Sequence, residues 1–409
     1  MSTGAAPFPP SGSEASALPA SFNTENPSES PTETAGALPF NKPTLVEIGA
    51  NHPNWGNSSH FWNEVATEVS RPISPDEIRA LAVKLRSHMD ENRRLLFSER
   101  FRDYPEKISP AYQGETFIAV PESERDLSLW FLGDIHGDLL AFLVAQKFIK
   151  QQEGIPRFIF LGDLFDRGKF NKEVLFHVLE LIVNNPEHHG LVVGNHDEGL
   201  RVTDGKFSSS VEPCEFADFL NAEDTDPGWR DLAEQAIRVF FHAPRAILLS
   251  DGLLVAHGGV PHVDRLPAIG NKDDLSERDC GEDFVWTRLH ESARKKIPNR
   301  STRGCSLGVT DFYAFCDKLS GILSRPVKGM IRGHDHIENR FAFFEGYTER
   351  PVLTINTMCH RYDGEMFGDF ERPVIVAKYV AGQMPVVHRI ETPKQLIFDV
   401  YSPKASVDG

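Results

Sequence analysis

The sequence lacks the features of membrane-spanning and secreted proteins. No apolar run approaches the ~20 residues that a helix needs to cross a bilayer. No Lys or Arg occurs before Lys42, so the N-terminus has neither the positive start of a secretory signal nor the arginines of an organelle transit peptide. We therefore predict a cytoplasmic protein with no membrane partner.

Cysteine is scarce and scattered. The chain has five cysteines, and no two of them form a CxxC pair. They are Cys214, Cys280, Cys305, Cys316 and Cys359. This odd, dispersed set indicates neither a disulfide framework nor a zinc ribbon, and it favours a reducing compartment.

Positive charge is also in short supply. The chain has 43 Lys and Arg against 59 Asp and Glu, which gives a net charge of −16. This balance argues against broad affinity for nucleic acid or for an anionic membrane. It leaves room for an anionic substrate, because bound metal ions and a few arginines reverse the sign of the charge locally.

The composition divides the chain into four parts. Residues 1–43 are dominated by Ser, Pro, Ala, Thr, Glu and Gly and are predicted to form a disordered tail. We expect residues 44–125 to be a helical lead-in that packs on a main domain of residues 126–392, and residues 393–409 to be a C-terminal tail. Within the lead-in, Ser74-Pro75-Asp76-Glu77 has the pattern of a capping box, and the apolar spacing that follows predicts a helix to about Phe97.

Five short apolar runs each lead into glycine combined with Asp, Asn or His. The runs and their motifs are Leu129–Leu132 with GDIHGD (133–138), Phe158–Leu161 with GDLFDRG (162–168), Leu191–Val193 with GNHD (194–197), Leu253–Ala256 with HGG (257–259), and Met330–Ile331 with RGHDH (332–336). Such runs predict buried strands, and sites in α/β sheets form outside the carboxyl ends of strands. Carboxylate and imidazole groups there suit divalent metal ions. We therefore predict one pocket rich in oxygen and nitrogen ligands.

The rest of the pattern predicts an α/β fold. Residues 138–151, 171–183 (with Asn171 as the cap) and 231–241 have the spacing of helices. The order strand, loop, helix, strand implies a largely parallel sheet. Beyond the last motif, residues 340–344, 352–355, 374–380 and 385–390 have the pattern of strands. We therefore predict a second sheet that faces the first, in a sandwich flanked by helices.

Each motif taken alone is a common turn, whereas the five in this order are highly specific. The series resembles that of the phosphoprotein phosphatase family, within the calcineurin-like metallophosphoesterase superfamily, over about residues 127–362. The resemblance implies a metallophosphoesterase β-sandwich with two divalent metal ions at the carboxyl ends of the strands, so residues 126–392 would be a calcineurin-like metallophosphatase domain. Manganese is the first expectation, with iron or zinc as alternatives.

The resemblance also implies a set of metal ligands. They are Asp134, His136 and Asp163 for the first metal ion, and Asp163 again with Asn195, His257 and His334 for the second. A shared carboxylate agrees with the separation of ~3.5–4 Å between the ions of two-metal sites.

Other residues match roles outside the ligand set. His196 matches the general acid of the family, and Asp166 matches the carboxylate that orients its imidazole. Adjacent side chains on an extended segment point apart, so His196 is not expected to share the ligand role of Asn195. Arg167 and Arg303 match two arginines that bind phosphate oxygens, and Asn195 is also expected to contact the substrate.

Two positions depart from the phosphoprotein phosphatase pattern. Met358 stands where the protein phosphatases carry an aromatic residue that lines the catalytic groove, although Cys359 fits. His336 follows His334, as in the broader superfamily. His336 either binds the first metal ion, or it points at solvent or hydrogen-bonds a neighbouring carboxylate.

The resemblance implies hydrolysis of phosphate monoesters on proteins, on phosphoserine or phosphothreonine, by direct attack of a hydroxide that bridges the two metal ions. The expected partner is a phosphoprotein substrate, and no nucleic acid partner is expected. Two alternatives stay open: a phosphoesterase acting on dinucleoside polyphosphates or other small molecules, and a degenerate phosphatase that serves as a binding scaffold. The scaffold is disfavoured, because no expected ligand or acid is missing from the motifs.

Overall fold

The computed structural model describes residues 40–51, 58–91, 116–120, 128–292, 297–298, 303–362 and 372–402. The chain divides into two units, residues 1–38 and 39–409, and all described residues belong to the second. The predicted disordered tail therefore lies almost entirely outside the described residues. None of the helices in the described ranges is both long and apolar enough to span a membrane.

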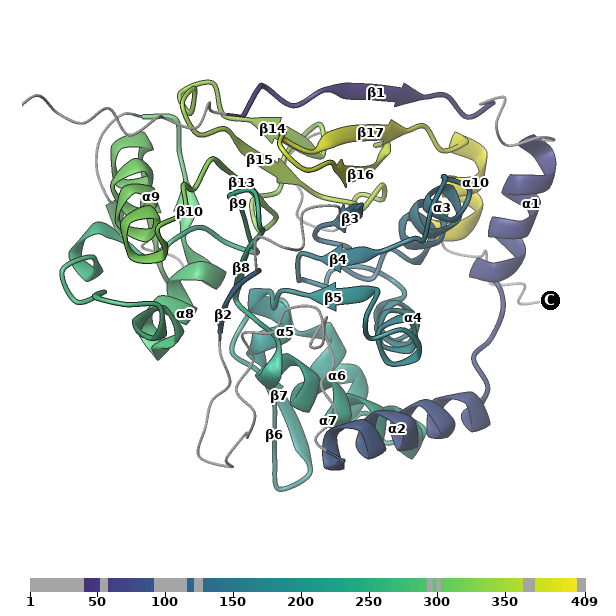
Figure 1. The fold of residues 1–409 in the computed structure, drawn as a ribbon. Helices are drawn as coiled ribbons and strands as arrows, with labels where there is room; N and C mark the ends of the chain where they lie inside the picture. Colours follow the sequence, from purple (N-terminus) through teal and green to yellow (C-terminus); the bar gives the residue numbers. More distant parts are fainter. Residues whose placement is uncertain are drawn as a thin grey trace, which may run out of the picture. The chain divides into compact units, whose positions relative to one another are not determined.

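Two six-stranded sheets form the centre of the fold (Figure 1). The first sheet has the order β1 (Leu45–Ile48), β17 (Val386–Ile390), β16 (Val374–Tyr379), β3 (Leu129–Leu132), β4 (Phe158–Phe160) and β5 (His189–Leu191). The second has the order β14 (Phe341–Phe343), β15 (Val352–Ile355), β13 (Gly329–Arg332), β9 (Leu253–Ala256), β8 (Ala246–Leu248) and β2 (Phe117–Ala119). The predicted two-sheet sandwich is confirmed.

Both sheets are mixed, so the prediction of a largely parallel sheet is only half right. The strands β3, β4 and β5, which lead into the first three motifs, are parallel, and so are β9 and β13, which lead into the last two. By contrast, β16 runs antiparallel to both β3 and β17. A short connection joins β16 to β17, and only antiparallel neighbours can be joined in this way.

The continuous apolar runs are explained by burial on both faces of a strand. In β3, Leu129 and Phe131 point into the core between the two sheets, whereas Trp130 and Leu132 point into the core beneath the helices. Successive side chains of a strand face opposite ways, so a strand covered on both sides needs apolar residues throughout. A third hydrophobic cluster lies on the outer face of the second sheet, where Met330 and Leu254 meet Phe312 and Phe315.

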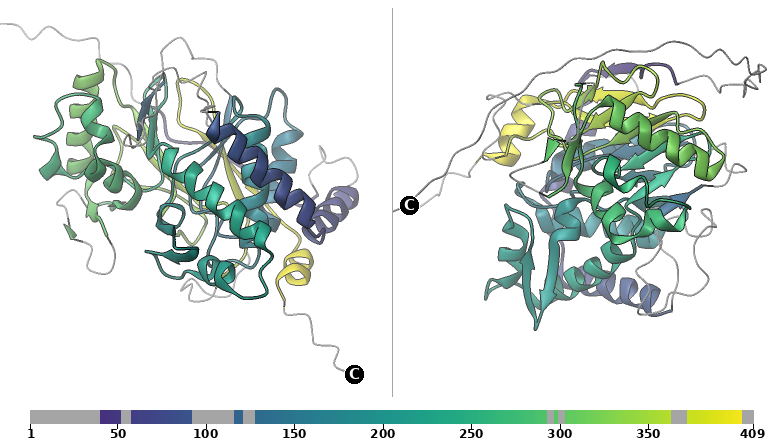
Figure 2. Two further views of the ribbon diagram at one scale, coloured as in Figure 1. Left: turned by 90° about the horizontal axis from the view of Figure 1, so that it is seen from below. Right: turned by 90° about the vertical axis from the view of Figure 1, so that its left-hand side faces the viewer.

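Helices cover the outer faces of both sheets (Figure 1 and Figure 2). The first sheet packs against α1 (Ser58–Val69), α3 (Leu139–Lys150) and α4 (Asn171–Asn184), and the second against α8 (Arg278–Trp286) and α9 (Val309–Leu323). The remaining helices are α2 (Pro75–Asp90), α5 (Asn195–Gly199), α6 (Glu215–Asn221), α7 (Pro227–His242) and α10 (Lys394–Tyr401). Short strands complete the fold: β6 (Leu200–Thr203), β7 (Lys206–Ser209), β10 (Arg288–Leu289), β11 (Ile297–Pro298) and β12 (Cys305–Leu307).

Most predicted helices are confirmed, with changes at their ends. The capping box at the start of α2 is present, since Glu77 N donates to Ser74 Oγ and Ser74 N donates to the Glu77 carboxylate. The predicted end at Phe97 lies outside the described residues. Asn171 is the first residue of α4 and not its cap, because Phe170 O already accepts a helical hydrogen bond, from Val174 N at 3.0 Å.

The predicted division of the chain at residues 43, 125 and 392 stays a prediction. Each of the two sheets contains strands from both the lead-in and the main domain. The lead-in supplies an edge strand to each sheet, because β1 pairs with β17 and β2 pairs with β8. The segment predicted as a C-terminal tail contains α10, whose Ile397 is buried in the same cluster as α1 and α3. Edge strands have weak sequence patterns, which explains why the sequence suggested helices alone.

Candidate functional site

The loops after β3, β4 and β13 have unusual backbone geometry. Asp134, His136, Asp163, Asp166, Arg167 and His334 all have positive φ angles, between 41° and 70°. A left-handed conformation is unfavourable for residues with a side chain, and it collects at functional sites where the surrounding structure maintains it. Six such residues in three loops that meet at one end of the sandwich point to a functional site.

Glycines let these loops approach one another. A Cβ atom on Gly194 would lie 2.3 Å from Asp163 N and Oδ1, and a Cβ atom on Gly333 would lie 2.3 Å from Asp134 Oδ1. No side chain fits at either place. Gly194 and Gly333 therefore let the loops at this end of the sandwich come close enough to share one site.

One cluster joins residues from both sheets. Asn195 Oδ1 lies 3.0 Å from His257 Nε2 and 2.8 Å from His334 Nδ1, and these two ring nitrogens are 3.2 Å apart. His257 Nε2 is also 3.4 Å from Asp163 Oδ2. The structure thus brings together the four residues expected at the second metal ion.

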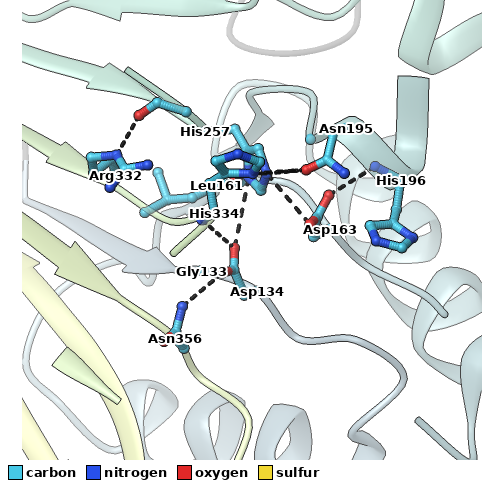
Figure 3. Close-up of polar contacts among 12 residues, drawn as sticks. Gly133, Asp134, Leu161, Asp163, Asn195, His196, His257, Arg332, His334 and Asn356 are labelled. Atoms are coloured by element: carbon cyan, nitrogen blue, oxygen red, sulfur yellow. Dashed lines mark hydrogen bonds and ion pairs between the residues drawn. The ribbon is translucent and has the colours of Figure 1, made fainter. Parts of the chain in front are cut away.

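A second cluster lies on the other side of Asp163. His136 Nε2 is 3.5 Å from Asp163 Oδ2 and 3.1 Å from His336 Nε2, and His336 Nε2 is 3.8 Å from Asp134 Oδ2. This cluster contains the three residues expected at the first metal ion, and it adds His336. Asp163 Oδ2 faces both clusters, as a shared ligand must; Figure 3 shows Asp163 beside the cluster of Asn195, His257 and His334.

The donor atoms fit divalent metal ions. In each of two trios, His136–Asp163–His196 and Asp163–His257–His334, one donor atom per residue lies within 4.8 Å of the others, although His196 is not among the predicted ligands. His136 Nδ1 donates to Phe165 O at 3.0 Å and His257 Nδ1 donates to Leu161 O at 2.6 Å, so in both rings Nε2 is turned toward Asp163. Fixing a ring by a hydrogen bond on its other nitrogen is typical of metal-ligating histidines.

The charges of the buried groups support the same conclusion. Burial lowers the pKa of His334 well below its ordinary value, and nearby Arg288 adds to the effect, so the ring is held neutral. Burial also raises the pKa of Asp134 to about 7, in spite of the charge of His257. The pKa of His257 rises to about 9, because the carboxylates of Asp163 and Asp134 outweigh the opposing effect of burial. The charge of Asp163 adds to the rise in the pKa of Asp134, and buried carboxylates this close together call for a compensating cation.

His196 is oriented differently from the ligand candidates. Its Nδ1 is 2.8 Å from Asp166 Oδ2, and Phe216 N donates to the other oxygen of Asp166 at 2.9 Å. His196 Nε2 lies 3.4 Å from a guanidinium nitrogen of Arg167. Burial raises the pKa of Asp166, and His196 opposes the rise. The predicted pair of an imidazole and its orienting carboxylate is thus in contact.

Asn195 and His196 do point in different directions, but not for the predicted reason. The two residues do not lie on an extended segment, because Asn195 begins α5 and Gly194 caps it. In a helix, consecutive side chains point ~100° apart. Asn195 consequently faces His257 and His334, whereas the His196 ring points away from them and contacts Asp166. Figure 3 shows the two side chains diverging.

The two predicted phosphate-binding arginines differ in position. A cavity of about 270 Å³ beside the clusters is lined by Arg167 and also by Arg288, with Trp286 and Glu212. Arg303 is exposed and does not line it. Its guanidinium lies 5.6 Å from the centre of the Trp286 ring and 3.8 Å from Glu282. The role of Arg303 stays a prediction, and Arg288 becomes the better placed residue.

Three further residues were missed by the sequence analysis as parts of the site. Asp197 accepts the N–H groups of Asp163, Leu164 and Gly194 at 2.9–3.1 Å, so it fixes the loop of the shared carboxylate. Asn356 Nδ2 donates to Asp134 Oδ2 at 2.6 Å. Arg288 bonds to Asp335 and to His334 O. Asp197 sits inside a quoted motif, which could have indicated its role, whereas Asn356 and Arg288 lack such a signal.

His336 provides a test of the first cluster. Replacing it (His336→Ala) is expected to weaken one of two manganese-binding events by ~10-fold or more and to leave the other unchanged, because a ring nitrogen beside His136 and Asp134 is lost. Calorimetric titration of the metal-free protein with manganese measures both events. Two unchanged affinities would remove His336 from the site.

Comparison with known proteins places this arrangement in a family. Residues 127–338 match the calcineurin-like phosphoesterase family. Over 274 residues the chain is 26% identical to serine/threonine-protein phosphatase 2B catalytic subunit A1 of Saccharomyces cerevisiae, which covers 62% of this chain and 45% of the relative. Over 254 residues it is 25% identical to serine/threonine-protein phosphatase C23G10.1 of Caenorhabditis elegans, with 58% and 48% covered. The chain thus spans about half the length of these relatives.

A solved structure agrees with the fold. A protein serine/threonine phosphatase from Saccharomyces cerevisiae with similarity to human phosphatase PP5 superposes with a TM-score of 0.54 at 17% identity, over 79% of this chain and 93% of that one. Members of the matched family use divalent metal ions, and the His and Asp groups of this chain can bind them. Since the family match extends over more than half of the 409 residues, this chain belongs to the calcineurin-like phosphoesterase family.

Proposed function

We propose that this chain is a metal-dependent phosphatase that hydrolyses phosphate monoesters on proteins, on phosphoserine or phosphothreonine. One observation carries the proposal: the Asp163 carboxylate faces both donor clusters, and the His196–Asp166 pair and Arg167 lie next to it. The protein substrate is supported by relatives that are serine/threonine phosphatases by name. A cytoplasmic location and manganese as the native metal remain parts of the proposal.

Each residue has a task that follows from its contacts. Two divalent ions, when bound, polarise the phosphoryl group and supply the nucleophile from water. Arg167 and Arg288 line the cavity from which a phosphate group reaches the clusters, and they bind its oxygens. His196 protonates the leaving oxygen from Nε2, while Asp166 holds Nδ1–H and thereby fixes the ring. Asn195 lines the same cavity and contacts the substrate.

A substrate panel tests the proposal. The manganese-loaded full chain is incubated with phosphoserine and phosphothreonine peptides, a phosphotyrosine peptide and diadenosine tetraphosphate, and released phosphate or nucleotide is measured. We expect the highest kcat/KM on phosphoserine or phosphothreonine peptides. Faster hydrolysis of the dinucleotide would replace the proposed substrate and keep the chemistry. Metal binding without hydrolysis of any substrate would indicate a binding scaffold.

A second, independent prediction concerns the effects of Arg288 and Arg303 on KM. Removing the charge of Arg288 (Arg288→Met) is expected to raise KM for nitrophenyl phosphate by ~10-fold or more, the value of a hydrogen bond to a charged group. The matched variant Arg303→Met should change KM by less than ~2-fold, because Arg303 is exposed and lies outside the cavity. Steady-state kinetics on both variants decides it. A larger effect at Arg303 would restore the assignment made from the sequence.

A further inference from the structure

The loop after β15 places a tyrosine, Tyr362, at the site. Neither the motifs nor the family match assigns a role to this residue. Tyr362 O–H is hydrogen-bonded to His336 Nδ1, and the two rings lie 5.2 Å apart at 72°. The guanidinium carbon of Arg167 lies 5.2 Å from the centre of the Tyr362 ring, within reach of a cation–π interaction. One side chain thus contacts both a candidate metal ligand and the candidate phosphate-binding arginine.

The position of Tyr362 bears on Met358, which stands where the protein phosphatases carry an aromatic residue. Met358 is buried, with 2% of its surface exposed, and it does not line the cavity beside the clusters. Tyr362, four residues further along, is half-buried and provides the aromatic ring beside His136, at 6.4 Å between ring centres. The loop that carries Met358 therefore still brings an aromatic ring to the site residues, from a different position.

Asp138 anchors the part of the loop that leads to Tyr362. Its carboxylate is buried and accepts the N–H groups of Cys359 at 2.8 Å and of His360 at 2.7 Å. It also caps α3 through Ala141 N at 2.9 Å. A buried carboxylate with this many donors holds the loop firmly to the start of α3. The same Asp138 closes the motif that carries Asp134 and His136.

The C-terminal helix α10 completes this anchor. Tyr401 O–H donates to Asp138 Oδ1, and the Tyr401 ring stacks on the His360 ring at 3.8 Å and 10°. Burial and the Asp138 carboxylate raise the pKa of the Tyr401 hydroxyl well above its ordinary value, so it stays a donor. Lys169 Nζ donates to Val400 O at 2.8 Å and ties the end of α10 to the loop that follows Arg167. Figure 1 shows α10 beside α3.

We propose that Tyr362 is a positioning residue of the catalytic site, and that Tyr401 of α10 keeps it in place through Asp138 and His360. Tyr362 acts through two separate groups. Its hydroxyl orients the His336 ring, and its ring orients the Arg167 guanidinium. Removing the contacts between α10 and the loop frees the loop, and this disturbs the His336 ring and the Arg167 guanidinium together. The inference rests on the proposed function only for the roles of His336 and Arg167.

Three substitutions separate these contributions in the full-length protein. Tyr362→Phe removes the hydroxyl and keeps the ring, so it should weaken one of the two manganese-binding events by ~10-fold and leave KM for nitrophenyl phosphate unchanged. Tyr362→Ala also removes the ring and should raise KM by ~2–5-fold in addition. Tyr401→Phe keeps the stack on His360. It should weaken the same manganese-binding event by less than Tyr362→Phe does. Phe398→Ala, on the exposed face of α10 (62% exposed), is the matched control and should change nothing.

The manganese titration decides the proposal without reference to any substrate. The expected order of loss is Tyr362→Ala and Tyr362→Phe above Tyr401→Phe, with Phe398→Ala equal to the parent protein. If Tyr401→Phe fails to fold, Lys169→Met replaces it, since it loosens the end of α10 from an exposed position. Unchanged manganese affinity in Tyr362→Phe, or equal behaviour of the α10 variant and the control, would overturn the proposal. Failure of the phosphatase proposal would show instead as inactivity of the parent protein.

Discussion

Replacing Asp163 by asparagine (Asp163→Asn) is expected to reduce bound manganese below two ions per chain and to lower hydrolysis of nitrophenyl phosphate by more than ~100-fold. Loss of a residue that only hydrogen-bonds to a metal ligand lowers metal affinity or activity by ~10–100-fold. Asp163 is placed as a ligand itself, in both clusters, so a larger loss is expected. Its Oδ2 lies 3.5 Å from His136 Nε2 and 3.4 Å from His257 Nε2. The amide of asparagine carries no charge and cannot replace a bridging carboxylate.

Elemental analysis of the dialysed protein, together with steady-state kinetics, measures both effects. Asp218→Asn is the matched control, because it removes an exposed carboxylate of α6 outside the site. The control should retain metal and activity. A variant Asp163→Asn that keeps two manganese ions and normal turnover would refute the shared-ligand assignment.

Replacing His196 by asparagine (His196→Asn) is expected to give the opposite pattern of metal content. His196 Nδ1 is bonded to Asp166, and its Nε2 faces Arg167, so two manganese ions should remain bound. Turnover should fall by ~10²–10⁴-fold, the usual contribution of a general acid. The loss should be smaller for phosphate esters with acidic leaving groups, because a good leaving group needs less protonation.

A series of phenyl phosphates with leaving groups of increasing acidity, assayed on both proteins, tests this dependence. His60→Asn, a substitution of an exposed histidine of α1, controls for the loss of an imidazole as such. An equal loss of turnover across the whole series would count against the acid role. A loss of metal would assign His196 to the first cluster instead.

Local elements were predictable because their causes are local. The capping box of α2 needs only residues three apart, and the strand β3 needs only a short apolar run before a glycine. The grouping of Asp134, His136, Asp163, Asn195, His257 and His334 was predictable from the order of the five motifs. Their roles as ligands remain to be tested by the substitutions above.

Side-chain directions were not predictable, because they depend on backbone angles and on neighbours that are distant in sequence. Asn195 and His196 diverge because they open a helix and not because the chain is extended. His336 reaches His136 although His334, two residues before it, has a φ of 68°. Neither result follows from spacing, since a helical turn and a left-handed residue each break the alternation that an extended strand would give.

The sequence by itself determined the strand-loop motifs and the two-sheet sandwich, since apolar periodicity depends on residues close together in the chain. The order of the motifs also carried the family resemblance that implied the candidate ligands. Only the tertiary structure decided that Arg288 lines the cavity in place of Arg303, that the Tyr362 ring lies beside Arg167, and that Tyr401 of α10 bonds to Asp138. These contacts join residues such as Asp138 and Tyr401, whose carboxyl and hydroxyl groups meet only after the sandwich has folded. Contacts of this kind depend on how the helices and sheets pack, and a pattern of neighbouring residues contains no record of that packing.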